Sequence, residues 1–239
     1  MINKYLIGIP CLYAAKITEN ALNSVVNKEN VDILIINNGA EPAVISVIEK
    51  FNKHYQNVTV INNSNNIYVN PAWNQILEYF LQHPDYDYVC IMNSDIIMQH
   101  QFNIVLDRNH FLSPNDIYIA TQVNNIVAIK NRLNAITDKK TEVTEGTAGV
   151  NIILNRKQAE IIYPIPEYIK IWFGDNWIYE ILREIGYKTY ILDSLQAFHY
   201  GSQNVSKLPG ISQIIEKDKK NWNFYSVYDK QKIIEKYKP

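Results

Sequence analysis

Short apolar runs alternate with polar, helix-length segments along the first half of the chain, and this alternation constrains the fold more than any other feature. Each run is apolar or β-branched and ends in small or polar residues, as strands buried in a parallel or mixed sheet do. The runs are KYLIGIPCLY (residues 4–13), VDILIINN (31–38) and NVTVINN (57–63), with residues 17–27 and 43–55 as the segments between them. This order predicts a βαβαβ unit and an α/β fold.

The clearest predicted helix follows the third run. Its apolar residues recur at i, i+3, i+4, i+7 and i+8, and they are Trp73, Ile76, Leu77, Phe80 and Leu81. Asn70 suits the N-cap and Pro71 the first helical position, and the segment ends before Pro84. The next apolar run, YVCIM at residues 88–92, predicts a fourth strand.

The motif Asn93-Ser94-Asp95 follows that strand directly. In open α/β sheets the ligand crevice lies outside the carboxyl ends of the strands. Polar residues that end the other strands should line the same edge, and they are Asn37, Asn38, Asn62 and Asn63. A carboxylate beside apolar neighbours has to be paired, hydrogen-bonded or bound to a cation. The alternative for Asp95 is a turn or helix N-cap role.

The second half predicts further strands and a second amphipathic helix. DIYIATQV (116–123) and KTYIL (188–192) indicate strands, TAGVNIILNRKQAEII (147–162) a strand that passes into a helix, and the polar residues 131–144 an exposed loop or short helix. Gly174 should let the chain turn sharply and set Asp175 at a helix start, where the helix dipole favours a carboxylate. Gly186 marks the end of this helix, and His199 comes after the strand that follows it.

Composition narrows the class of protein. The 239 residues are 47% hydrophobic with a net charge of -1, which is ordinary for one large domain with a small appendage and leaves no broad basic surface for nucleic acid. Cys11 and Cys90 lie in apolar surroundings, so we expect buried free thiols. No run of about 18 apolar residues occurs and the N-terminus does not resemble a signal peptide, so we expect a cytoplasmic protein.

Taken in order, these pieces resemble the GT-A fold glycosyltransferases, specifically the inverting, family 2-like enzymes. The matching pieces are the Ile9-Pro10 strand, the strand ending Asn-Asn-Gly, Asn66 and Asn74 around the helix start, Ser94-Asp95, WFGDN (172–176) and the H-x-G-S motif from His199. No single motif is specific, and the ordered set over residues 4–206 carries the resemblance. It implies a Rossmann-like, mixed, mostly parallel central sheet flanked by helices.

The resemblance also implies a division of the chain and roles for single residues. Residues 1–206 would be the GT-A domain, with a nucleotide-sugar-binding half (1–100) and an acceptor and catalytic half (101–206), and residues 207–239 a C-terminal helical extension. Asp175 would be the catalytic base, and Asp95 with His199 would hold Mn²⁺ or Mg²⁺. The donor would contact Pro10, Asn38, Asn66, Asn93, Ser94 and Asp95, and the acceptor Trp172, Phe173, Gly174 and Asn176.

The chemistry of sugar transfer calls for these residue types. A nucleoside diphosphate gains negative charge as it leaves, and a hard cation held by carboxylate oxygen neutralises that charge. The acceptor hydroxyl loses a proton as it attacks, which an ionised carboxylate can accept. Two residues depart from the family pattern: Asn93 is neutral where an acid is common, and Asn38 stands where many relatives have aspartate. UDP, dTDP and GDP sugars all remain open as donors.

Other functions compete with this interpretation. A non-catalytic sugar- or nucleotide-binding relative is favoured if Asn93 abolishes metal binding, and a sugar nucleotidyltransferase would need a Gly-rich, basic N-terminal loop that IGIPCLYAAK lacks. The acceptor is a hydroxyl group, on a glycan or, less favoured, on a hydroxylated DNA base in a phage-infected host. The run from 214 to 239 mixes lysine with aromatic residues, which predicts a cover for the sheet, a homodimer contact or a peripheral membrane contact.

Overall fold

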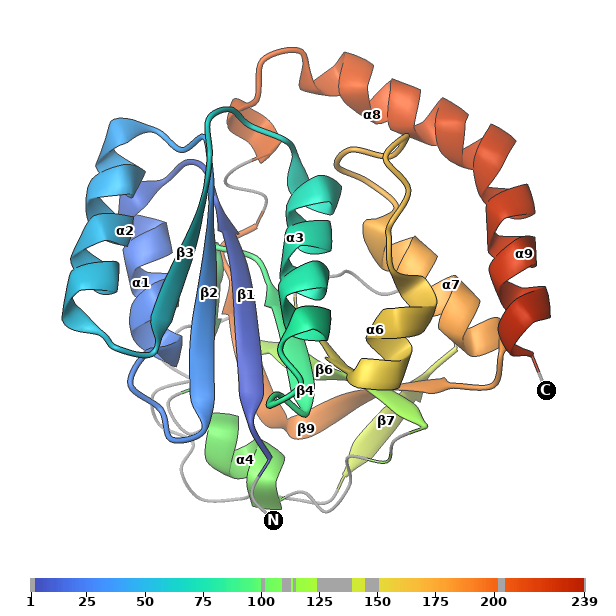
Figure 1. Ribbon diagram of the computed structural model, residues 1–239, viewed down its shortest axis with the longest axis horizontal. Coiled ribbons are helices and arrows are strands. Elements are labelled where there is room, and N and C mark those ends of the chain that lie inside the picture. Colours follow the sequence, from blue (N-terminus) through green and yellow to red (C-terminus); the bar gives the residue numbers. More distant parts are fainter. Residues whose placement is uncertain are drawn as a thin grey trace.

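The computed structural model describes residues 3–99, 102–108, 113, 115–123, 139–144, 151–201 and 205–238. The described strands form one mixed sheet in the order β3-β2-β1-β4-β8-β6-β9-β5, with β7 paired to β9 (Figure 1). Helices cover both faces of this sheet. The predicted α/β fold with a C-terminal helical segment is confirmed.

The first half is the predicted βαβαβ unit followed by a further helix and strand. Its strands are all parallel, and they are β1 (Tyr5–Cys11), β2 (Val31–Asn38), β3 (Val58–Asn63) and β4 (Tyr88–Met92). The helices between them are α1 (Ala15–Val25), α2 (Pro42–His54) and α3 (Val69–Gln82). Parallel pairing brings the carboxyl ends of these four strands to one edge, which positions the site.

The second half adds strands of both directions. It contains β5 (Ile96–Met98), α4 (Phe102–Arg108), β6 (Asp116–Val123), β7 (Lys140–Val143), β8 (Asn151–Asn155), α6 (Arg156–Ile162), α7 (Gly174–Glu184) and β9 (Lys188–His199). Strand β8 is antiparallel to β4 and β6, and β5 is antiparallel to β9, while β6 and β9 are parallel. Parallel pairing therefore prevails only in the first half.

The C-terminal segment is helical throughout its described length. It contains a short 3-10 turn, η1 (Val205–Lys207), then α8 (Ile211–Asn221), a π-helical turn, η2 (Trp222–Ser226), and α9 (Val227–Tyr237). In Figure 1 these helices curve from the top of the molecule down beside α7. None of the helices in the described ranges is both long and apolar enough to cross a bilayer.

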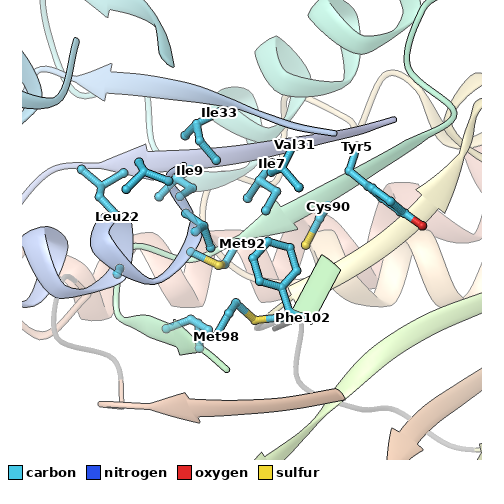
Figure 2. Close-up of a cluster of buried hydrophobic side chains, with 14 of the residues drawn as sticks. Tyr5, Ile7, Ile9, Leu22, Val31, Ile33, Cys90, Met92, Met98 and Phe102 are labelled. Atoms are coloured by element: carbon cyan, nitrogen blue, oxygen red, sulfur yellow. The ribbon is translucent and has the colours of Figure 1, made fainter. Parts of the chain in front are cut away.

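Alternation along the strands divides the core into two layers. In β1, Tyr5, Ile7 and Ile9 face the layer shown in Figure 2, which α1, α2 and α4 cover, whereas Leu6 faces the layer under α3, α6 and α7. This is the period of two that places successive side chains on opposite faces of a sheet. Both cysteines are buried free thiols, as predicted, and burial raises the pKa of each to about 12, which keeps them unreactive.

Two predicted elements differ from the observed ones. Residues 131–144 were expected to form an exposed loop or short helix, but Lys140–Val143 form strand β7, while residues 131–138 lie outside the described residues. This strand is polar because it pairs only at the rim of the sheet, where charged side chains are tolerated. The predicted short strand at 188–192 extends to His199, because β6 continues to pair with it beyond a register shift after Ala120.

Candidate active site

Asp95 and His199 lie side by side at the carboxyl edge of the sheet. Asp95 occupies the turn between β4 and β5 and is 4% exposed. His199 ends β9, where it is the register partner of Ile96 in the antiparallel β5–β9 pair. His199 Nε2 lies 3.4 Å from Asp95 Oδ1, and the N–H of Tyr200 donates to the Asp95 carbonyl oxygen at 3.0 Å. Strand pairing therefore joins two groups that are far apart in sequence.

The Asp95–His199 pair offers one carboxylate and one imidazole to a cation. This mixed oxygen and nitrogen set suits Mn²⁺ better than Mg²⁺, which prefers oxygen ligands alone. Asn93 adds no charge, and Ser94 is buried. Within the described ranges, no group of three or more His, Cys, Asp or Glu side chains is arranged to hold a metal. The pair could therefore supply two ligands to a divalent cation, and the remaining ligands would have to come from other groups.

Asn38 and Asn66 shape the loop before α3 by bonding to each other. Asn38 ends β2 and is 3% exposed, and its Nδ2 donates to Asn66 Oδ1 and to the Tyr68 carbonyl, both at 3.1 Å. Its Oδ1 accepts the N–H of Ile67 at 3.0 Å. Pro10 is half-buried in the neighbouring strand β1. The amide of Asn38 is thus engaged by hydrogen bonds inside the protein. Contact of Pro10, Asn38 and Asn66 with a donor stays a prediction.

The start of α7 carries the predicted base. Asp175 lies in the first turn, and its Oδ1 accepts the N–H of Asn176 at 2.9 Å. The sharp turn before the helix is made by Phe173, whose φ is 67°, and not by Gly174 as the sequence predicted. Trp172 is 49% exposed. An accessible indole thus lies three residues before the carboxylate, on the same turn.

Asn70 connects the start of α3 to this turn. It is not the predicted N-cap, because α3 already begins at Val69, after Tyr68, whose φ is 72° and ψ 179°. Its side chain is buried instead, and its Nδ2 donates to the carbonyls of Ile169 at 3.2 Å and Trp172 at 3.0 Å. These bonds hold the backbone that leads into α7.

Gly174 is needed for close packing against α3. A Cβ there would lie 2.2 Å from Asn70 Oδ1 and 3.2 Å from the ring of Trp73. One turn further along α3, Asn74 makes two bonds with the backbone of Ile165, one as donor and one as acceptor, each at 2.8 Å. The helix that follows β3 therefore supports the whole segment before Asp175 from one side.

Asp218 on α8 supports the same segment from the other side. Its carboxylate is fully buried and accepts three backbone N–H groups, from Lys170 at 2.8 Å, Ile171 at 2.7 Å and Trp172 at 3.0 Å. Asn221 donates to the Tyr168 carbonyl at 2.7 Å. Nothing in the sequence distinguishes Asp218, because it belongs to the charged run KDKK, which is typical of an exposed helix face. It is the functional candidate that sequence reasoning missed.

Apolar contacts join the end of β1, this segment and the C-terminal helices. Leu12 after β1, Ile171 and Leu208 are buried in one small cluster at this edge. Phe173, predicted to contact the acceptor, stacks on Trp222 of η2 with ring centroids 5.1 Å apart and planes 10° from parallel. The ring of Phe173 is therefore engaged by the C-terminal helices, and Trp172 is the exposed aromatic residue of the pair.

Tyr179 lies one helical turn after Asp175 in the interior. Burial, followed by the nearby charge of Asp175, raises the pKa of Tyr179 well above its usual value. The phenol therefore remains neutral at physiological pH.

A polar groove lies at the opposite end of the sheet from these residues. It is lined by the amino ends of β1 and β2 and the end of α2, including Lys4, Lys28, Asp32 and His54. None of the predicted site residues borders it. The predicted residues are gathered instead at the carboxyl edge, as expected for an open α/β sheet.

Comparison with known proteins identifies a matching family. Residues 6–133 match the family model described as Glycosyl transferase family 2. No protein of curated function matches the chain significantly.

Three similar structures share the fold. The mannosyltransferase PcManGT from Pyrobaculum calidifontis, in complex with GDP-Man and Mn²⁺, aligns with a TM-score of 0.63 and 11% identity over 98% of this chain and 72% of its own. S. aureus TarS 1-349 in complex with UDP aligns with a TM-score of 0.58 and 15% identity, over 94% of this chain and 73% of its own. GalNAc-T7 with UDP, GalNAc and Mn²⁺ aligns with a TM-score of 0.62 and 10% identity over 94% of this chain. The present chain spans only 50% of the length of GalNAc-T7. At these identities the likeness establishes the fold alone.

Proposed function

The chain belongs to glycosyl transferase family 2, and from that membership we propose that it moves a sugar from a nucleoside-diphosphate sugar to an acceptor hydroxyl with inversion of configuration. The observation that carries the proposal is the Asp95–His199 pair, 3.4 Å apart at the carboxyl edge of the parallel strands. Residues 1–100 would bind the donor and residues 101–206 would supply the base and the acceptor surface, with 207–239 as a helical extension.

Asp95 and His199 would hold a divalent cation together with the donor diphosphate. When bound, Mn²⁺ or Mg²⁺ would offset the negative charge that the leaving diphosphate gains. Two similar structures, PcManGT and GalNAc-T7, were solved with Mn²⁺, which supports this cofactor. Asn93 and Ser94 would line the diphosphate, and the neutral side chain of Asn93 leaves Asp95 as the charged residue of that motif.

Asp175 would be the general base. An ionised carboxylate in the first turn of α7 is favoured by the helix dipole and so available to accept the proton of the attacking hydroxyl. Proton acceptance of this kind accelerates transfer by about 10²–10⁴-fold. Because the hydroxyl attacks the sugar carbon directly, one base suffices and no covalent intermediate with the protein forms.

Trp172 would form the floor for the acceptor, since its indole is half exposed and its backbone is held from two sides. Gly174 and Asn176 would border the same position. Pro10, Asn38 and Asn66 would lie near the base and ribose of a UDP, dTDP or GDP sugar. Asn38 would act there mainly by holding Asn66 and the loop before α3.

The test is hydrolysis of a panel of UDP, dTDP and GDP sugars by the intact chain, with Mn²⁺, Mg²⁺ or a chelator. Release of one nucleoside diphosphate that depends on the cation supports the proposal and identifies the donor without the acceptor. A non-catalytic nucleotide-binding protein would instead release no product in this assay, although the bound nucleotide would raise its free energy of unfolding. If every nucleotide bound equally well without a cation, Asp95 and His199 would not hold a cation at the donor site.

A further inference from the structure

Large apolar side chains are exposed mainly on one short stretch of the C-terminal helices. Six such residues occur in the described part of the chain, and four of them fall between residues 224 and 228. These four are Phe224 at 75% exposure, Tyr225 at 48%, Val227 at 67% and Tyr228 at 66%. Exposed apolar side chains that cluster in this way mark an interaction surface.

Of these four side chains, Tyr225 packs on Tyr168, with ring centroids 5.3 Å apart. The other three are at least 66% exposed. The opposite face of the same helices already attaches the extension, through buried Asp218 and Ser226 and through the Phe173–Trp222 stack. Lys230 adds an ion pair with Glu180 of α7. Phe224, Val227 and Tyr228 are therefore exposed on helices that other side chains already attach to the rest of the protein.

Exposed lysines flank this apolar cluster on both sides. The exposed lysines of α8 and α9 are Lys217, Lys219, Lys220, Lys232 and Lys236. Residues 207–239 contain eight lysines and four acidic residues, so they carry a net charge of +4, whereas residues 1–206 carry -5 and the whole chain -1. Positive charge is thus concentrated where the apolar side chains are exposed.

We propose that this outer face, defined as Phe224, Tyr225, Val227 and Tyr228 with the five flanking lysines, binds the surface of a bilayer rich in anionic lipid. Helices with aromatic residues and lysines on one face lie in the plane of the interface, with their apolar side chains at the headgroup boundary. Anionic headgroups attract the lysines, while the acidic remainder of the chain is repelled. This combination orients the protein with its extension toward the membrane.

The experiment is co-sedimentation of the full chain with vesicles of phosphatidylcholine alone or mixed with phosphatidylglycerol. We expect binding to the mixed vesicles that weakens as salt is added, and little binding to phosphatidylcholine alone. The double variants Phe224→Ser/Tyr228→Ser and Lys217→Glu/Lys220→Glu should each lower the partition coefficient at least about tenfold. This readout is independent of sugar transfer.

Matched controls change the same chemistry elsewhere. Ile104→Ser removes an exposed apolar side chain from α4, and Lys53→Glu/Lys157→Glu makes the same charge change on α2 and α6. These variants should bind like the unchanged chain, and thermal unfolding confirms that all variants fold. Equal binding to both vesicle types, or equal binding by all variants, would overturn the proposal. A dimer that Phe224→Ser/Tyr228→Ser disperses, without any vesicle binding, would assign the face to a second copy instead.

Discussion

The Asp218 carboxylate of α8 accepts the backbone N–H of Trp172 at 3.0 Å, together with those of the two preceding residues. A single buried side chain thus supplies the hydrogen bonds that a neighbouring strand would otherwise give to this backbone. Because Trp172 lies directly before the turn into α7, the C-terminal helices contribute to the positions of both the proposed acceptor floor and Asp175.

Asp218→Asn should therefore affect both stability and acceptor use. An amide presents one acceptor oxygen and an NH₂ group, so at least one of the three N–H groups loses its partner, at a cost of about 1–3 kcal/mol in the free energy of unfolding. Urea unfolding measures this change, and we also expect a higher acceptor KM with donor hydrolysis retained. Glu216→Gln, an exposed change on the same helix, is the control. Equal effects of the two variants on acceptor KM would mean that Asp218 does not position the acceptor side.

Asp175→Asn should lower turnover by at least about 10²-fold while the donor still binds, because the variant cannot accept the proton of the acceptor hydroxyl. Steady-state transfer kinetics and donor titration by calorimetry measure the two effects separately. Glu184→Gln removes an exposed carboxylate from the same helix and should leave turnover unchanged. Unchanged turnover in Asp175→Asn would exclude this residue from the mechanism.

Asp95→Ala and His199→Ala should each weaken the binding of Mn²⁺ and of donor together, by at least about tenfold, since they remove the two protein groups of the proposed cation site. Calorimetric titrations of donor with and without Mn²⁺ give both affinities. His54→Ala, an exposed histidine on α2, is the matched control. Donor affinity that keeps its full dependence on Mn²⁺ in Asp95→Ala would show that the cation binds elsewhere.

Gly174→Ala should destabilise the protein by about 1–3 kcal/mol, because the new methyl group overlaps the buried side chain of Asn70. The clash predicts that the effects of substitutions at positions 70 and 174 on the free energy of unfolding are coupled. A double-mutant cycle, measured by urea unfolding, tests this coupling. Asn70→Ala and Gly174→Ala together should cost less than the sum of the single changes, since the first removes the atom that the second contacts. Strict additivity would mean that another contact, such as the one with the ring of Trp73 at 3.2 Å, and not the contact with Asn70, requires glycine.

The buried thiols predict a loss of stability in alkaline solution. Folded Cys11 and Cys90 have pKa values raised to about 12, from 9.0 in the unfolded chain. Below pH 9 both states keep the thiols protonated, and above it only the unfolded state ionises. The free energy of unfolding should then fall by about 1.4 kcal/mol per pH unit for each thiol as the pH rises from 9 to 12. Cys11→Ala/Cys90→Ala should show a shallower decline over this range, and an identical slope would contradict the assignment.

The sequence predicted the half of the fold in which local pattern and tertiary structure agree. β1 to β4 and α3 have strong apolar periodicity, and the positions of Asp95 and Asp175 follow from the ends of such elements. Strand β7 was missed because an exposed rim strand has no apolar pattern. Asn70 was predicted to be an N-cap because an asparagine at a helix start suits that role equally well. Only the tertiary hydrogen bond to the Trp172 carbonyl shows that its side chain instead joins two segments in the interior.

The pairing of β5 with β9 and the bonds to Asp218 could not be predicted for a related reason. Both join residues that are distant along the chain, and neither depends on local propensity. The approach of His199 to Asp95 was available from the sequence only through a resemblance, whereas the structure accounts for it by strand register.

The position of Asp218 along the chain has a consequence for the order of folding during synthesis. Strands β1, β2 and β3 can pair as they leave the ribosome, because all of their strand partners lie within the first half. The segment before α7 emerges with three backbone N–H groups whose partner has not yet been synthesised. A nascent chain can therefore pair β1 to β3 early, while the segment that carries the proposed acceptor floor becomes rigid only after α8 has been translated.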